Sequence, residues 1–296
     1  MLFKILGFSI MSLLEPKYRY NLGYALSGGG AKGFAHLGAL KVLEQHELKP
    51  DVIVGTSAGS LAGVFYADGF HPDEITELFR KKEFREFAEF TIPIAGFFKS
   101  SGLHTFLKNN LRAKTFEELQ IPFISVATDW EKAKTVAFSE GKNLIDAVVA
   151  SCTVPIVFHP VLIDDIAYVD GGLFKNFPVS VIRKDCKYVI GVNVSLMVPP
   201  AEKTNIKKIA ERTFNLMSNS NTLPDRKLCD ILIETAGLEK YTMFDLNNIE
   251  KISEIGRITA DERMQENDAK RIVSRCLRYK ELSEKITPYI KQVKRR

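Results

Sequence analysis

The sequence predicts an α/β fold in which a parallel sheet is covered by helices, and two observations carry this prediction. The first 70 residues alternate between apolar strands and helices, which is typical of parallel strands with helices packed on them. The elements predicted there are a strand at 21–27, a helix at 31–46, a strand at 51–54 and a helix at 60–68. Apolar strands then recur along the chain, and the segment at 188–194 is strongly apolar.

The remaining elements continue this pattern, with one exception. Strands are predicted at 121–127, 135–138, 167–169 and 231–234, a helix at 144–151, and a largely helical part after residue 201. Residues 72–120 differ, since they are helical and charged and carry many phenylalanines, and we expect an inserted helical cap there. The rings are Phe79, Phe84, Phe87, Phe90, Phe97 and Phe98. We expect the aromatic segment 84–98 either to form a binding cap or to provide ordinary core aromatics under a helical subdomain.

The composition excludes several classes of protein. The chain has 296 residues, of which 45% are hydrophobic and 26% charged, values near those of ordinary soluble domains. That balance argues against a disordered chain and against a protein with several membrane spans. The cysteines lie far apart without a C-x-x-C pair, so neither a disulfide framework nor a zinc site is expected. They are Cys152, Cys186, Cys229 and Cys276.

The two ends of the chain have distinct compositions. Residues 270–296 carry ten Lys or Arg against two Glu, so the basic excess of the chain lies in this tail. A basic amphipathic helix can lie on an anionic membrane surface, and a solvated terminal helix is the alternative. The apolar run of the first 14 residues is too short to span a bilayer. We expect it to dock on the domain or on lipid rather than to act as a signal peptide.

A glycine-rich turn follows the first predicted strand. Gly28, Gly30 and Gly33 spell G-x-G-x-x-G, the pattern of a dinucleotide-binding turn. Backbone N–H groups at a helix N-terminus can cradle a pyrophosphate, and they can equally hold an oxyanion. The pattern alone leaves both open. A P-loop is disfavoured, because Lys32 is followed by Gly33 and not by Ser or Thr.

A second turn favours the interpretation that the glycine turn holds an oxyanion rather than a pyrophosphate. Gly55, Ser57 and Gly59 fit G-x-S-x-G between a strand and a helix, which is the context of a nucleophile elbow. Such a turn projects the serine hydroxyl clear of the sheet, and the N–H of Ala58 can donate to an oxyanion. The alternative is a turn of small residues with a structural serine. A dinucleotide site would need an acidic residue at the end of this strand, whereas Asp51 precedes the strand.

Both turns follow adjacent parallel strands and therefore open at the same edge of the sheet. The glycine turn would then bring the N–H groups of Gly29 and Gly30 beside Ser57. Lys32 would add positive charge near an oxyanion or bind a phosphate head group. A solvated lysine at the start of the helix is the alternative for Lys32.

A serine nucleophile needs a base. The chain order Ser-Asp-His would require a histidine after the acid, but no histidine follows His159, which we expect to be structural. His36 lies early on the first helix, near the glycine turn, and stays open as a candidate. Asp170 is the better candidate, because it ends a short apolar strand and two glycines let the chain turn sharply after it. Its pKa would have to be raised for it to act near neutral pH, and an Asp-Gly hairpin turn is the alternative.

Three motifs in this order resemble the patatin-like phospholipase family. They are SGGGAKG at 27–33, GTSAG at 55–59 and DGG at 170–172. The stretch ASCTVPIVFHPV at 150–161 also resembles a block that lies shortly before the aspartate in that family. The third motif ends in glycine where many relatives have alanine, a small change. The resemblance covers residues 20–200 well and extends to about 260.

The resemblance implies a Ser-Asp dyad without a catalytic histidine, metal or cofactor, in which Ser57 is the nucleophile and Asp170 the proton acceptor. It implies a three-layer α/β/α fold and a lipid acyl hydrolase of the phospholipase A type. The oxyanion hole and the other motif glycines that it implies are Gly28, Gly29, Gly30, Lys32, Gly33 and Ala58, followed by Gly55, Gly59, Gly171 and Gly172.

We therefore expect an apolar segment at 1–20, a catalytic domain at 21–200 with its cap at about 72–120, and a mostly helical remainder of the same domain at 201–296. The expected partner is a phospholipid or other acyl lipid, in a cytoplasmic protein with a peripheral membrane contact. No nucleic acid is expected. The alternatives are an acyltransferase or thioesterase that uses the same nucleophile, and a lipid-binding module with a decayed site.

Overall fold

The computed structural model describes residues 18–80, 82, 84–87, 89–90, 98–196, 206–243 and 245–294. The apolar run at the N-terminus therefore lies outside the described residues, and so does Phe97 of the predicted cap.

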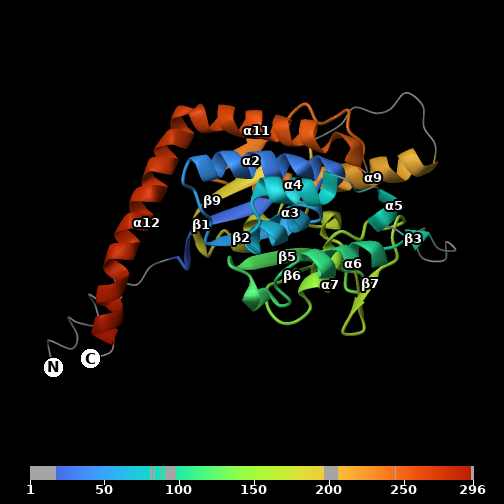
Figure 1. Ribbon diagram of the computed structural model, residues 1–296, viewed down its shortest axis with the longest axis horizontal. Helices are drawn as coiled ribbons and strands as arrows, with labels where there is room; N and C mark the ends of the chain where they lie inside the picture. Colours follow the sequence, from blue (N-terminus) through green and yellow to red (C-terminus); the bar gives the residue numbers. More distant parts are fainter. Residues whose placement is uncertain are drawn as a thin grey trace.

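A mostly parallel sheet forms the centre of the fold (Figure 1). Its strands are β1 (Tyr20–Leu26), β2 (Val52–Thr56), β5 (Phe123–Asp129), β6 (Lys134–Phe138), β7 (Val161–Ile163), β8 (Ile166–Asp170), β9 (Cys186–Asn193) and β10 (Ile231–Glu234). They lie in the order β10-β9-β1-β2-β5-β8-β7, and β6 pairs with β5 outside this path. β10, β9, β1, β2 and β5 are parallel, whereas β6 and β8 run antiparallel to β5, and β7 to β8. β3 (Glu89–Phe90) and β4 (Phe98–Lys99) form a separate antiparallel pair.

Helices connect and cover these strands. They are α2 (Phe34–Gln45), α3 (Ala58–Ala67), α4 (Pro72–Arg80), α5 (Phe84–Phe87), α6 (Ser101–Asn110), α7 (Leu144–Ser151), α8 (Val179–Ile182), α9 (Ile206–Ser220), α10 (Leu223–Arg226), α11 (Ile249–Gln265) and α12 (Asn267–Lys294). Short 3-10 turns are η1 (Gly30–Gly33), η2 (Phe116–Glu118), η3 (Gly171–Leu173) and η4 (Leu246–Asn248). α11 packs along α2, and the two run side by side across the top of Figure 1.

The strands bury side chains on both faces, because successive residues of a strand point to opposite sides. Tyr24 and Ile53 belong to the large apolar core that the sheet shares with α2, α3, α7 and α11. Their neighbours Ala25 and Val54 belong to a second core on the other face, shared with α8. Helices thus cover both faces of the sheet, and the predicted α/β fold is confirmed.

Phe79, Phe87 and Phe106 of the segment 72–120 belong to the larger core, whereas Phe98 packs against a separate, smaller cluster. The ring centroids of Phe79 and Phe106 are 4.9 Å apart, and those of Phe87 and Phe106 are 5.2 Å apart. Phe65 of α3 joins them, with its ring centroid 6.0 Å from that of Phe79. The segment contains the helices α4, α5 and α6 as expected, but it also contains the strand pair β3 and β4, which the sequence did not predict. Its description as a cap over the site stays a prediction.

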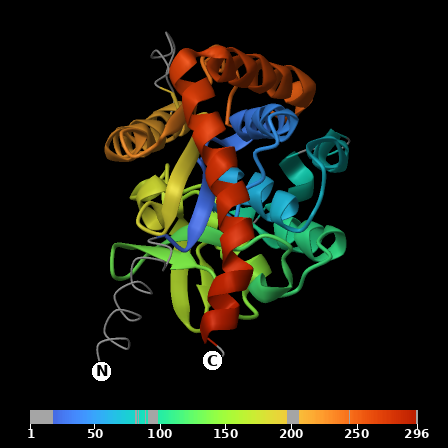
Figure 2. The ribbon, with the colours of Figure 1, turned by 90° about the vertical axis from the view of Figure 1, so that its left-hand side faces the viewer.

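The part of the chain after residue 200 is built into the same sheet. β10 pairs with β9 through Ile231 and Ile190, and α11 packs along α2. The basic tail forms α12, which descends along the left side of Figure 1 and crosses the front of Figure 2. It contacts the body where Asn21 Nδ2 donates to the carbonyl of Cys276 at 3.2 Å. Within the described part of the chain, no helix combines the length and apolar character that a membrane crossing requires.

Candidate active site

Two turns open at the same edge of the sheet because β1 and β2 run parallel. Leu26, the last residue of β1, pairs with Gly55, one residue before the end of β2. The glycine turn after β1 and the serine turn after β2 therefore start at nearly the same level. This is the arrangement expected from the sequence.

The third turn, which follows Asp170, lies at the same level of the sheet, although its strand β8 runs antiparallel to β5. Thr56, the last residue of β2, pairs with Val126 of β5. Ser57 therefore reaches the level of the next β5 residue, Ala127. β8 runs antiparallel to β5 and ends with Asp170 paired to Ala127. The register of the sheet alone thus brings Ser57 and Asp170 to one level, on either side of β5.

Ser57 occupies a strained turn between β2 and α3. Its φ of 52° and ψ of −121° lie in a region that residues with a side chain rarely adopt. The turn is possible because Gly55 and Gly59 flank it, since a β-carbon on either would overlap backbone atoms of the neighbouring segments. α3 begins at Ala58 without a capping side chain, so its first N–H groups stay available to a ligand. Ser57 itself is 8% exposed.

The two carboxyl oxygens of Asp170 differ in their hydrogen bonding among the described residues. The N–H of Gly172 donates to Oδ1 at 2.7 Å, whereas Oδ2 is buried without a hydrogen-bond partner among the described residues. Burial raises the pKa of Asp170 from 3.8 to about 7, and the Ser57 hydroxyl and the Gly172 N–H partly offset this effect. Ser57 is thus close enough to influence the carboxyl group, although no hydrogen bond closes between its hydroxyl and Oδ2.

The glycine turn brings its backbone close to the cavity beside Ser57 and also carries N–H groups there. The N–H of Gly28 donates to the carbonyl of Asn176 at 2.9 Å, so Gly28 is engaged within the protein. Gly29 and Gly30 border the same cavity as Ser57. Gly30 has a φ of 58°, a conformation that favours glycine.

Gly33 brings the glycine turn against the start of α3. A β-carbon on Gly33 would overlap the β-carbon of Ala58. Ala58 also borders the cavity next to Ser57. The N–H groups of the glycine turn and those at the start of α3 therefore belong to one small region around the serine.

A cavity of about 150 Å³ is bordered by Ser57 and Asp170. Its wall is largely apolar, and the helical segment 72–120 contributes to it. The apolar side chains of the wall include Ile75, Phe79, Phe87, Leu103, Phe158 and Phe214. Phe79 and Phe87 therefore serve both the core and the cavity. An apolar pocket with a few convergent polar groups is typical of sites for small apolar molecules.

The family comparison agrees with this arrangement. The family model described as patatin-like phospholipase matches residues 24–182, more than half of the chain, and the match spans all three turns. The chain belongs to the patatin-like phospholipase family. The resemblance drawn from the three motifs is thereby confirmed.

Curated relatives include a mammalian and a bacterial protein. The human patatin-like phospholipase domain-containing protein 6 is 29% identical over 187 residues, which cover 58% of this chain and 13% of that protein. The YqhO protein of Bacillus subtilis is 28% identical over 223 residues, 64% of this chain and 75% of that protein. This patatin-like chain thus spans only a small fraction of the mammalian relatives that it matches.

Two solved structures show a partial likeness. VipD from Legionella pneumophila matches with a TM-score of 0.49 and 14% identity, over 84% of this chain and 67% of that one. The type III effector protein ExoU matches with a TM-score of 0.42 and 13% identity, over 86% of this chain and 54% of that one.

His36, the candidate base that the sequence left open, is not among the described residues that border the cavity. His36 is fully buried, and its Nε2 lies 2.8 Å from the carbonyl oxygen of Ser27. Burial lowers the pKa of His36 to about 4, partly offset by that hydrogen bond. Its Nε2 is therefore not free to take a proton from Ser57. His36 instead braces the first residue of the glycine turn.

Lys32 is 9% exposed. Burial lowers its pKa, while Glu239 and Glu211 raise it. Of the glycine turn, Gly29, Gly30, Ala31 and Gly33 border the cavity, and Lys32 is not among the described residues that do so. A place for Lys32 in an oxyanion hole stays a prediction.

Sequence reasoning missed the residues that hold the patatin-like motifs in place. The N–H of Ser57 donates to Oγ of Ser151, and the N–H of Asp170 donates to the carbonyl of Thr153. Both belong to the stretch 150–161, which the sequence singled out without a role. Asn176 borders the cavity four residues after Gly172, and no motif marked it.

Proposed function

We propose that this chain is a lipid acyl hydrolase in which Ser57 is the nucleophile and Asp170 the general base. The observation that carries the proposal is the pairing of a strained serine with a buried carboxyl group on the wall of one apolar cavity. Asp170 has one oxygen without a hydrogen-bond partner among the described residues and a pKa of about 7, so it can be ionised and still bind a proton well near neutral pH. Membership of the patatin-like phospholipase family supports an acyl lipid as the substrate.

The reaction would proceed in two acyl-transfer steps. Ser57 Oγ attacks the ester carbonyl carbon, its proton passes to Asp170, and the electron pair of the C=O bond moves onto the oxygen. In this proposal the oxyanion accepts hydrogen bonds from N–H groups of Gly29, Gly30 and Ala58, residues that border the cavity. The alcohol or lysolipid leaves with the proton from Asp170, and water then hydrolyses the acyl-enzyme.

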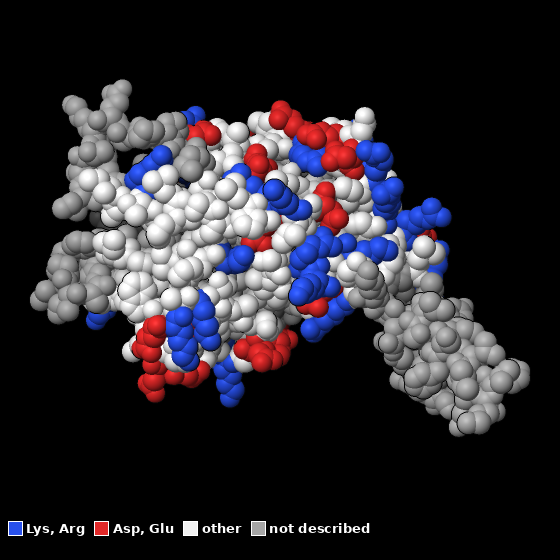
Figure 3. Space-filling view, turned by 180° about the vertical axis from the view of Figure 1, so that it is seen from behind, with Lys and Arg blue, Asp and Glu red and all other residues white. Residues whose placement is uncertain are grey.

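The surroundings of the cavity favour a substrate that is delivered from a lipid surface. Phe174 is 46% exposed and Ile156 59% exposed, and each lies two residues from a residue that borders the cavity. Figure 3 shows a broad area with few charged side chains on one face of the molecule, whereas Lys and Arg gather towards the other side of that view. We propose that this protein meets a membrane peripherally through the exposed apolar residues beside the cavity.

Substitution of the two central residues tests the proposal. Ser57→Ala should abolish turnover of a nitrophenyl acyl ester and labelling by a fluorophosphonate probe, while the melting temperature stays near that of the wild type. Asp170→Asn should reduce turnover to a similar level. Two exposed positions provide matched controls, Ser220→Ala and Asp165→Asn, and both should keep full activity. Turnover that survives Ser57→Ala would disprove the assignment.

A further inference from the structure

Asn176 stands in the candidate site without an assigned role. It lies in the loop after η3, where the chain passes close to the glycine turn. It borders the same cavity as Ser57. Only 2% of Asn176 is exposed. A polar side chain so deeply buried normally has all of its hydrogen-bonding groups paired.

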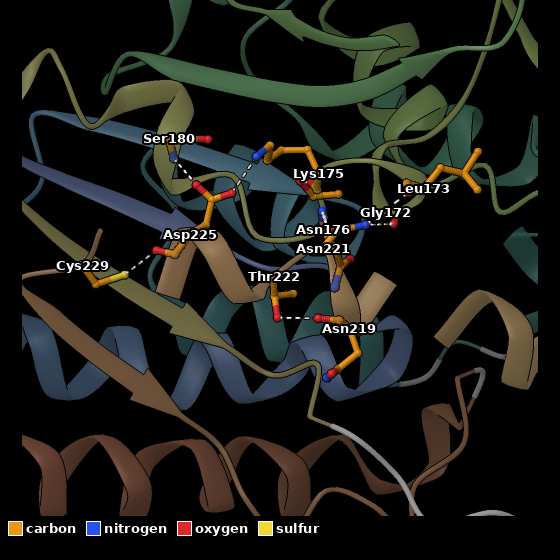
Figure 4. Close-up of polar contacts among 11 residues, drawn as sticks. Gly172, Leu173, Lys175, Asn176, Ser180, Asn219, Asn221, Thr222, Asp225 and Cys229 are labelled. Atoms are coloured by element: carbon orange, nitrogen blue, oxygen red, sulfur yellow. Dashed lines mark hydrogen bonds and ion pairs between the residues drawn. The ribbon is translucent and has the colours of Figure 1, made fainter. Parts of the chain in front are cut away.

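The backbone of Asn176 is fixed on both sides. Its N–H donates to Oδ1 of Asn221 at 2.8 Å, and its carbonyl accepts the N–H of Gly28 at 2.9 Å. The amide nitrogen of Asn221 donates to the carbonyls of Gly172 at 2.8 Å and Leu173 at 3.2 Å, so one side chain ties down the whole turn after Asp170 (Figure 4).

A second anchor holds the neighbouring residues. Lys175 Nζ lies 2.7 Å from Oδ2 of the buried Asp225, and Oδ1 of Asp225 accepts the N–H of Ser180 at 2.7 Å (Figure 4). The loop is thus held by Asn221, which lies between α9 and α10, and by Asp225 of α10. These contacts fix the position of Asn176 at the cavity wall.

The side chain of Asn176, by contrast, is left partly unpaired. Its Nδ2 is buried and has no hydrogen-bond acceptor among the described residues. The carboxamide lies between two motif glycines, since a β-carbon on Gly28 would overlap Oδ1, and one on Gly172 would stand 3.1 Å from it. The same β-carbon on Gly28 would stand 3.2 Å from Cβ of Ser57. The amide is therefore beside the nucleophile and the glycine turn.

We propose that the Asn176 side chain is a further catalytic residue, whose Nδ2 donates a hydrogen bond to the acyl carbonyl oxygen of the substrate. This inference rests on the proposed acyl hydrolase function. As Ser57 attacks and its proton moves to Asp170, the carbonyl oxygen gains the negative charge that an unpaired, fixed donor stabilises best. Within the described part of the chain Nδ2 has no acceptor, and the tetrahedral intermediate would supply one.

The test compares Asn176→Ala and Asn176→Asp with the wild type on a nitrophenyl acyl ester. Asn176→Asp keeps the shape of the side chain and removes the N–H donor. We expect kcat to fall roughly 100-fold to 1000-fold in both variants, with KM changed only a few-fold. The exposed Asn109 provides matched controls, Asn109→Ala and Asn109→Asp, which should keep the wild-type kcat.

Two inhibitors separate an oxyanion donor from a structural residue. A trifluoromethyl ketone forms a tetrahedral adduct with an oxyanion, and an ether lipid of the same chain length fills the cavity without one. The Asn176→Ala variant should bind the ketone at least roughly tenfold more weakly and the ether with unchanged affinity. Equal weakening of both, or a kcat within threefold of the wild type, would overturn the proposal.

The pH profile of Asn176→Ala excludes an indirect effect through the base. An oxyanion donor leaves the acid limb of the kcat/KM profile at its wild-type position, whereas a residue that acts by tuning Asp170 would shift that limb. A shifted limb therefore counts against the proposal. The proposed acyl hydrolase function is tested separately, by the loss of turnover in Ser57→Ala and Asp170→Asn. A failure of the Asn176 proposal can therefore be distinguished from a failure of that function.

Discussion

The backbone N–H of Ser57 and the hydroxyl of Ser151 share a 2.8 Å hydrogen bond, and the same hydroxyl donates to the carbonyl of Val126 at 2.6 Å. Ser151 thus ties the strained turn after β2 to the neighbouring strand β5. The bond also engages the N–H of Ser57 itself, which leaves the oxyanion to donors on other residues. A residue far away in the sequence therefore sets the orientation of the proposed nucleophile.

Ser151→Ala should lower both stability and activity. The substitution leaves the buried N–H of Ser57 and the carbonyl of Val126 without this partner, which costs about 1–3 kcal/mol. Because the strained turn loses a support, we also expect kcat to fall while the substrate still binds. Chemical denaturation and steady-state kinetics measure the two effects. Ser220→Ala is the matched control, and a fully active, fully stable Ser151→Ala would contradict this role.

The activity on a soluble ester should depend on the ionisation of Asp170. The carboxyl group accepts a proton only when it is ionised, and burial raises its pKa to about 7. kcat/KM should therefore rise about tenfold per pH unit below neutrality and level off above it. A pH–rate profile checks this, with Asp165→Asn as a control that keeps the same profile. A flat profile across this range would exclude Asp170 as the base.

Because its pKa is raised, Asp170 should lower the free energy of unfolding as the pH rises from about 4 to about 7. Below pH 3.8 the carboxyl group is protonated in both the folded and the unfolded state. As the pH rises towards 7, the unfolded chain releases the proton and the folded chain retains it, so the free energy of unfolding falls. The total loss is at most about 4 kcal/mol, from about three pKa units.

Asp170→Asn should remove this pH dependence. We expect the stability of the variant relative to the wild type to increase steadily between about pH 4 and pH 7, and to stay constant above that range. Denaturant unfolding at several pH values measures the difference. A difference that is independent of pH would show that the carboxyl group is not held protonated by burial.

Phe174→Glu should weaken activity on vesicles and spare activity on a soluble ester. Removal of an aromatic side chain from a lipid contact costs roughly 1.5–3 kcal/mol, which corresponds to at least roughly tenfold in vesicle binding. Sedimentation with anionic phospholipid vesicles measures the binding directly. Leu162→Glu is a matched control, because Leu162 is 69% exposed and belongs to β7, which does not border the cavity. Equal effects of the two substitutions would contradict a docking role for Phe174.

Local patterns in the sequence predicted the parts of the fold that depend on local physics. Short apolar segments between turn residues located β1, β2, β5, β9 and β10, and the small residues around Ser57 indicated the turn itself. β7 was missed because it is only three residues long and all three are apolar, so the sequence shows no alternation there, although one residue is partly buried, one exposed and one buried. The reversed direction of β8 was not expected either, because direction depends on the connection and partners and not on the strand's own residues.

The supports of the site could not be predicted because they depend on contacts between distant segments. Ser151 and Ser57 are 94 positions apart, and Asn176 and Asn221 are 45 apart. A serine at the end of a helix or an asparagine in a loop has many local roles, so the residue type carries little information without the partner. Ser57 and Asp170 could be singled out because glycines and strand ends surround them, whereas their supports have no such context.

Asn221 and Asp225 lie outside the segment 24–182 that the family model matches, yet they fix the loop between Asp170 and the glycine turn. A graft of the matched segment into a foreign scaffold would carry every motif residue and leave this loop unanchored. Such a chimera should still match the family model, but we expect its catalytic activity to be low. Crossover points for protein engineering are therefore better placed after Glu234, the end of β10, than at the border of the matched segment.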